Sequence, residues 1–149
     1  MENFEEIVSA YSRVDATLDE EIKLARRSGD PFQELQVQQQ TTARAYFLVL
    51  WAEFEAGMDR KCRTVIDSGK SEGWRESRSW QVLDSIGMDR LPLLERVALV
   101  IDKNSHHYRE IKEKYQLRNE LAHGVWPNAN VDLYREADDF RQLYERLDG

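Results

Sequence analysis

The sequence has little of several residue types, and each shortage excludes a class of protein. Its 149 residues include one cysteine, Cys62, which excludes an internal disulfide and a C-x-x-C zinc site. Seven glycines and three prolines argue against a β-sandwich or a disordered chain. The longest nearly apolar run, 45–52, is too short to cross a bilayer. The acidic start, 1–6, predicts no signal peptide, and with the single cysteine it indicates a cytoplasmic location.

Positive charge is also in short supply. The chain has 21 Lys and Arg residues against 28 Asp and Glu residues, which gives a net charge of −7. A protein that coats nucleic acid presents a basic face, because phosphate contacts supply most of its affinity. The balance therefore excludes a high-affinity DNA coat or repressor, but not an enzyme that touches a few phosphates. Glu136, Asp138 and Asp139 near the C-terminus indicate that RNA would approach elsewhere.

Apolar residues at three- and four-residue steps are abundant, and this spacing is typical of amphipathic helices. It predicts helices over residues 3–27, 32–66, 76–86, 92–102, 105–122 and 132–147. Gly29 is expected to end the first helix, residues 68–74 to form a loop, and Asn104 or Ser105 to cap the fifth helix. We expect a single all-α domain over 1–149, built as an antiparallel up-and-down bundle of four main helices plus short extra helices.

The second helix is predicted to be the longest and the most buried. Residues 45–52 are apolar on every side, so this part is expected either to lie centrally or also to meet another subunit. Arg60, Lys61 and Arg63 fall near its expected end, where cations complement the helix dipole. Cys62 between them is expected to act as a small apolar residue.

One short stretch, Arg118-Asn119-Glu120-Leu121-Ala122-His123-Gly124, combines groups that suit phosphate chemistry. The Arg118 guanidinium is a planar fork of donors that stays charged, and the His123 imidazole exchanges a proton near neutral pH. The apolar stripe of this helix continues through Arg118 to Ala122, so Arg118 is expected to be at least half-buried and to need a partner.

The spacing of the two groups restricts how they can meet. On one straight helix Arg118 and His123 diverge by roughly 140°. Either the helix ends before His123, as Gly124 and Pro127 indicate, or the site combines residues from two copies of the chain. Ordinary structural roles also stay open. Arg118 would then pair with Glu53 or Glu55, and His123 would be a helix-terminal imidazole favoured by the dipole.

Arg118-Asn119-x-x-x-His123, late in an all-helical chain, resembles the R-x4–6-H motif of the HEPN superfamily (higher eukaryotes and prokaryotes nucleotide-binding). The match spans residues 118–124 and the helical setting. It implies a metal-independent endoribonuclease that needs no cofactor and dimerises, so that two motifs share a cleft. Many such domains are toxins of toxin–antitoxin pairs or antiviral effectors, which makes RNA, a second copy and an antitoxin the expected partners.

The resemblance also implies a role for each residue of the motif. His123 would be the general acid or base, Arg118 would bind the scissile phosphate, and Asn119 would orient the histidine or a phosphate oxygen. Attack by the 2′-OH would leave a 2′,3′-cyclic phosphate and a 5′-OH. Two other functions stay open: a non-catalytic HEPN-like module that binds a nucleotide or a protein, and a helical adaptor for a different protein.

Aromatic and histidine residues elsewhere have alternative interpretations. Trp74 and Trp80, beside Arg75 and Arg78, form either an RNA-contacting flap or an ordinary loop pinned by an aromatic side chain. Trp126 either stacks on a base or covers the end of the bundle. His106 and His107 are expected to be solvated residues of a first turn, because no ligand spacing for a metal accompanies them.

Overall fold

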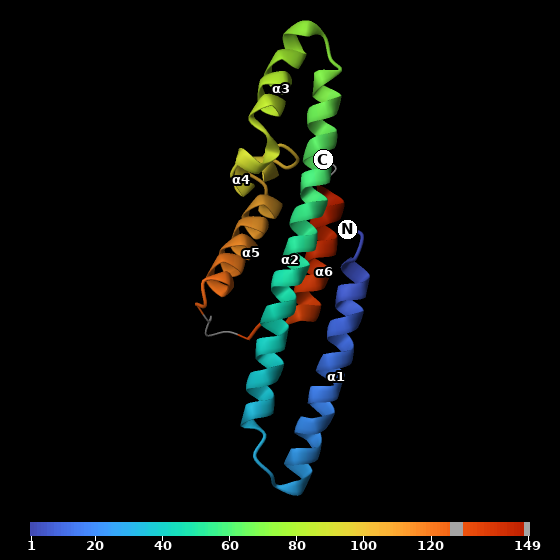
Figure 1. The fold of residues 1–149 in the computed structure, drawn as a ribbon, viewed down its shortest axis with the longest axis vertical. Coiled ribbons are helices and arrows are strands. Elements are labelled where there is room, and N and C mark those ends of the chain that lie inside the picture. Colours follow the sequence, from blue (N-terminus) through green and yellow to red (C-terminus); the bar gives the residue numbers. More distant parts are fainter. Residues whose placement is uncertain (126–129, 148–149) are drawn as a thin grey trace. The chain divides into compact units, whose positions relative to one another are not determined.

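The computed structural model of the chain describes residues 1–125 and 130–147, without the side chain of Asp89. Each regular element within these residues is a helix, and they contain no strand, so the predicted all-α class is confirmed. The elements are α1 (Phe4–Ser28), α2 (Gln33–Lys70), α3 (Trp74–Ile86), the 3-10 helix η1 (Met88–Arg90), α4 (Leu93–Val97), α5 (His106–Ala122) and α6 (Leu133–Arg146) (Figure 1).

The chain divides into two compact units. Unit 1 comprises Met1–Phe54 and Gln116–Phe140, and unit 2 comprises Glu55–Tyr115 and Arg141–Gly149. Helices α2, α5 and α6 each contribute residues to both units. The single domain expected from the chain length therefore stays a prediction.

Aromatic packing forms the core of unit 1. Helix α1 lies antiparallel beside the first half of α2 (Figure 1), and Gly29 ends α1 in the left-handed conformation, as predicted. The Phe140 ring of α6 lies 5.1 Å from Phe54, 5.7 Å from Phe47 and 6.0 Å from Trp51, between ring centroids. All four side chains are buried. Rings at these distances add to the free energy that burial alone provides, so Phe140 fixes the middle of α6 against α2.

A polar cluster around Asp15 joins three helices of unit 1. One Asp15 oxygen accepts hydrogen bonds from Gln39 Nε2 (2.8 Å) and the Tyr11 hydroxyl (3.3 Å), and the other accepts from the Tyr134 hydroxyl (3.2 Å). Burial, followed by the charge of Asp15, raises the pKa of Tyr11 well above its usual value. The phenol therefore stays protonated and remains a donor to the carboxylate.

The middle of α2 is not buried on every side. Phe47, Leu50 and Trp51 are buried as predicted, but Ala45 and Ala52 are exposed and Val49 is 49% exposed. The prediction of burial on every side is wrong for one chain, because the other helices of unit 1 cover only one face of α2. An uncovered apolar strip remains there.

Helix α2 ends later than the sequence predicted. It continues through Ser68, Gly69 and Lys70, so the predicted loop over 68–74 shrinks to residues 71–73. Helix α3 folds back beside this end of α2 (Figure 1), and the Trp80 ring packs onto Gly69 so closely that an added Cβ would overlap it. The glycine thus serves a close helix contact rather than a turn.

The basic residues of this part of α2 have side-chain partners instead of a helix terminus. Arg63 donates to Asp84 Oδ1 of α3 at 2.6 Å, and the Lys61 ammonium lies 4.3 Å from the centre of the Tyr144 ring. The predicted role of these cations at the end of α2 is wrong, because that end lies at Lys70.

Helix α4 is pinned to α2 by a charged cluster in unit 2. It ends at Val97, earlier than the predicted 102, and continues as turns. The Arg96 guanidinium donates to Asp59 Oδ2 at 2.6 Å and to Glu55 Oε1 at 2.7 Å. The Cys62 Sγ donates to the Arg96 carbonyl at 3.2 Å. Burial, with the nearby Asp59 charge second, raises the pKa of Cys62 to about 11. Cys62 is therefore a buried, protonated thiol.

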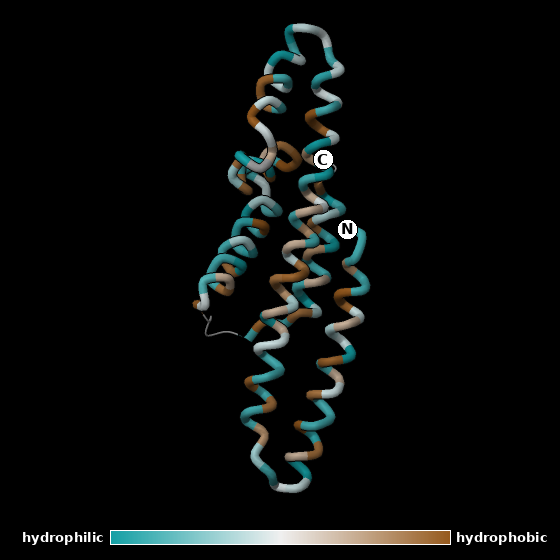
Figure 2. The backbone as a smooth tube through the Cα atoms, in the orientation of Figure 1, coloured by the Kyte–Doolittle hydropathy of each residue, from teal (hydrophilic) through white to brown (hydrophobic). Residues whose placement is uncertain are grey.

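Hydrophobic and hydrophilic residues alternate in short segments along the helices (Figure 2). Within residues 1–125 and 130–147, each helix is too short or too polar to span a bilayer.

Candidate functional site

The predicted motif lies at the C-terminal end of α5. The helix starts where the Ser105 hydroxyl accepts the Tyr108 backbone N–H at 3.1 Å, so Ser105 is the cap. It ends at Ala122, and a paired-bond turn follows: Gly124 N donates to Leu121 O at 3.1 Å and Val125 N donates to Glu120 O at 2.8 Å. Gly124, at φ 73°, supplies the left-handed residue that this turn requires. The helix thus ends before His123, as one of the two predicted alternatives had it.

Arg118 and Asn119 are brought together by the helix end. Both are half-buried, and Arg118 NH1 donates to Asn119 Oδ1 at 3.0 Å. No described carboxylate of unit 1 bonds to Arg118. Glu53, one of the two carboxylates predicted to pair with Arg118, accepts the Asn3 backbone N–H at 3.2 Å. Glu55 bonds to Arg96. Neither of the proposed structural pairings of Arg118 is therefore seen, and its guanidinium retains donors that no carboxylate occupies.

His123 is not bonded to Arg118 in the part of the chain that the structure describes. Its backbone N–H donates to Asn119 O at 3.0 Å, and its side chain is exposed. No hydrogen bond or ion pair joins the imidazole to any residue that the structure describes. Within one chain the fold brings Arg118 to Asn119 and leaves His123 open to solvent. The predicted burial of Ala122 is wrong, because the helix ends there and Ala122 is exposed.

Electrostatics distinguish the two units sharply. Unit 1, which holds the motif, has 15 acidic and seven basic residues, whereas unit 2 has 13 acidic and 14 basic residues; together these account for all 28 and 21. The net charge is therefore −8 for unit 1, from 7 basic minus 15 acidic residues, and +1 for unit 2, from 14 minus 13. A polyanion would be repelled by unit 1 as a whole and would be bound there only through local groups.

Unit 1 has a hollow of about 410 Å³ that sequence reasoning missed. Its lining consists of Gln33, Gln36, Val37, Gln40, Arg44 and Asn130. It contains four amides, one guanidinium and no carboxylate, and Gln40 Oε1 is buried without a hydrogen bond from a described residue. These groups suit a polar or singly anionic ligand. The glutamine spacing of three and four, continuing to Arg44, was the available signal, but it predicted only polar helical turns.

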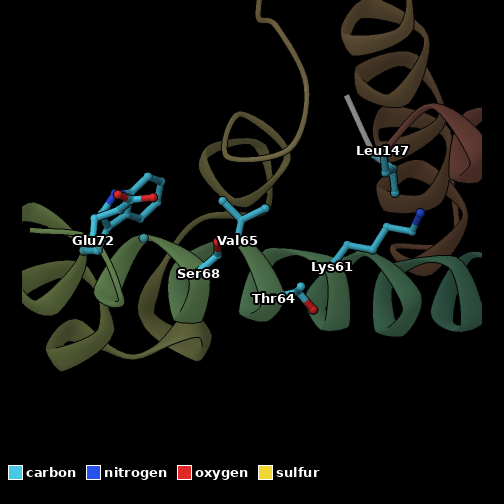
Figure 3. A pocket seen from close by; sticks show the side chains of 8 residues that line it. Lys61, Thr64, Val65, Ser68, Glu72 and Leu147 are labelled. Carbon is cyan, nitrogen blue, oxygen red and sulfur yellow. The ribbon is translucent and has the colours of Figure 1, made fainter. Parts of the chain in front are cut away.

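Unit 2 has a hollow of about 500 Å³ along α2. Figure 3 shows Lys61, Thr64, Val65 and Ser68 in a row on the helix, with Leu147 at one end and Glu72 at the other. Trp80, packed on Gly69, completes the lining. None of the residues predicted for phosphate chemistry lines it.

His106 and His107 lie on the surface of the first turn of α5, as predicted. Their rings approach the Glu110 carboxylate at 3.9 and 3.8 Å, a contact that becomes an ion pair when they are protonated. Among the described residues no group of three His, Cys, Asp or Glu side chains is arranged to hold a metal ion.

Trp126 and Pro127 lie outside the described residues, so the structure does not test their predicted roles. Comparison with protein-family models, with curated proteins and with solved structures finds no match to this chain.

Proposed function

We propose that this protein is a metal-independent endoribonuclease of the HEPN type that cleaves RNA through Arg118, Asn119 and His123. It would act in the cytoplasm as a toxin or defence effector, controlled by an antitoxin or another partner protein. The helices would form an antiparallel up-and-down bundle of four main members, as the resemblance implies.

The observation that carries this proposal is the state of Arg118. A half-buried arginine normally requires a carboxylate, because desolvating its charge is costly. Arg118 instead contacts a neutral amide, Asn119 Oδ1, within the described part of the chain. A charged fork that lacks an internal counter-ion is suited to an external anion, and a phosphodiester matches its geometry.

The proposed chemistry follows from the properties of the three side chains. His123 would take the proton of the ribose 2′-OH or give one to the leaving 5′-oxygen. Arg118 would stabilise the negative charge that develops on the phosphate oxygens, while Asn119 holds the guanidinium plane. The products would be a 2′,3′-cyclic phosphate and a 5′-OH.

A second copy of the chain would complete the site. His123 is exposed and no hydrogen bond joins its imidazole to Arg118 among the described residues, so a neighbouring chain could supply the other half of the pair. The apolar strip of α2 around Val49, which is 49% exposed, offers surface for such a homodimer.

The direct test is cleavage of a mixed RNA in EDTA by wild type and His123→Ala, with analysis of the product ends. We expect only the wild type to cut and to leave cyclic phosphate, with a loss of about 10²–10⁴-fold for the variant. Circular dichroism and the oligomeric state of both proteins serve as controls. Equal cutting by the two proteins would refute the role of His123.

The separation of the two groups also favours a second candidate, a non-catalytic HEPN-like module that binds a nucleotide or a protein. In that case Arg118 would bind an anion without a proton-transfer partner. Wild type would then bind an RNA oligomer in an Arg118-dependent manner without cutting it, at any enzyme concentration.

A further inference from the structure

Two tryptophans flank the α2–α3 turn, and the structure separates their roles. Trp80 packs onto Gly69 and lines the hollow of unit 2. Trp74, the first residue of α3, is 75% exposed, more than any other large hydrophobic side chain that the structure describes. Trp80 therefore packs α3 against the end of α2, whereas most of the Trp74 side chain is exposed to solvent. Exposing a ring of this size forgoes a large gain in burial free energy.

Two arginines share the exposed face of Trp74. At 100° per residue, Arg78 lies about 40° and Arg75 about 100° from Trp74, both in the same direction around α3. Both are exposed, and neither makes an ion pair or hydrogen bond with a described residue. The face therefore carries one aromatic ring and two available guanidinium groups. We call Trp74, Arg75 and Arg78 the α3 face.

Acidic residues nearby do not neutralise this face. Asp84 on the same helix is held by Lys70 at 2.7 Å and by Arg63 at 2.6 Å. Glu76 lies about 200° around α3 from Trp74 and folds back beside Gly73. Unit 2 as a whole has 14 basic and 13 acidic residues, so it lacks the repulsion that unit 1 exerts on a polyanion.

We infer that the α3 face binds single-stranded RNA, with a base stacked on Trp74 and phosphates held by Arg75 and Arg78. Stacking on an exposed aromatic ring with neighbouring guanidinium groups on the backbone is how proteins hold unpaired strands without reading sequence. The identity of the ligand as RNA rests on the proposed function. The face itself requires an unpaired nucleic-acid strand, because a duplex hides the base faces.

The binding test uses the full chain and a 2′-O-methylated uridylate oligomer of about ten nucleotides, which cannot undergo 2′-OH attack. Fluorescence anisotropy at low salt should show Trp74→Ala binding about 5- to 100-fold more weakly than wild type. Trp74→Phe should retain most of the affinity, because phenylalanine still stacks. Val82→Ala is the matched control, since Val82 is 58% exposed on the same helix and should leave binding unchanged.

The salt dependence tests the arginines. Arg75→Gln and Arg78→Gln should each reduce the slope of log affinity against log salt by about 0.7. A duplex of the same length should compete poorly. The inference is overturned if the wild type does not bind the oligomer, or if Trp74→Ala and Val82→Ala bind as the wild type does.

The two proposals fail separately. Trp74-dependent binding without any RNA cleavage would refute the proposed nuclease and support the α3 face. His123-dependent cleavage with unchanged binding by Trp74→Ala would do the reverse.

Discussion

Unit 1 and unit 2 each contain a half-buried arginine, and the two arginines are used differently. In unit 2, the Arg96 side chain is 13% exposed and bonds to both Glu55 and Asp59, so its charge is compensated within the fold. In unit 1, Arg118 makes a hydrogen bond to the Asn119 amide oxygen and none to a carboxylate among the described residues. Both arginines are intermediate in exposure, but their hydrogen-bond partners differ. An arginine available for chemistry is recognised by the absence of a carboxylate rather than by its depth.

The charge balance adds a second contrast. Unit 1 carries the predicted catalytic residues yet is strongly acidic, whereas unit 2 lacks them and is close to neutral. Under the proposed function, RNA would be bound by local positive groups rather than by the net charge of unit 1. Cleavage should then weaken steeply with added salt.

The largest effect on stability is expected in the aromatic core of unit 1. Phe140→Ala removes a fully buried ring that contacts Phe47, Trp51 and Phe54. The free energy of unfolding should fall by about 3–5 kcal/mol, measured by urea denaturation. Tyr134→Ala, at a 44% exposed ring of the same helix, should cost clearly less. Equal losses would mean that Phe140 is not central to this core.

A smaller loss is expected when Arg96 is replaced. Arg96→Ala leaves Glu55 and Asp59 without their shared cation and should lower the free energy of unfolding by about 2 kcal/mol. This loss is smaller than for a fully buried ion pair, because water screens the two partly exposed carboxylates. Arg90→Ala, at an exposed arginine, should stay within about 0.5 kcal/mol of wild type. Equal stability of the two variants would show that the contacts of Arg96 with Glu55 and Asp59 do not stabilise unit 2.

Cys62 provides a probe of unit 2 alone. Its thiol pKa is raised to about 11 by burial, so the unfolded chain ionises first as the pH rises. The contribution of Cys62 to the free energy of unfolding is therefore fully present below the ordinary thiol pKa. It is lost as the pH rises from that value to about 11. Thiol labelling at pH 8 should be slow in wild type and faster in Arg96→Ala. Rapid labelling of the folded wild type would contradict the burial of Cys62.

Much of the fold was predictable from residue spacing. The stripes of α1 and α6, the cap at Gly29 and the all-α class follow from local periodicity, which the sequence displays directly. The end of α2 was not predictable, because Gly69 lies in the helix and packs against Trp80, eleven positions along the chain. Local signals at Gly69 favour a loop, and a tertiary contact overrides them.

The candidate site was predictable only in part. Gly124 indicated correctly that α5 ends before His123. The turn that ends a helix in this way needs a residue in the left-handed conformation, and a glycine at that position is visible in the sequence. That no described carboxylate bonds to Arg118 was not predictable, because spacing alone also allowed pairing with Glu53. The hollow around Gln40 and Arg44 depends on where Asn130 lies, and no local pattern specifies that.

The most direct test of the contrast between the two arginines is a paired measurement on Arg118→Ala: RNA cleavage in EDTA and the free energy of unfolding. We predict that cleavage falls by about 10²-fold or more, while stability stays within about 1 kcal/mol of wild type, because no described carboxylate loses its partner. Loss of stability comparable to that of Arg96→Ala, with cleavage unchanged, would show that Arg118 is a structural residue and contradict the proposal.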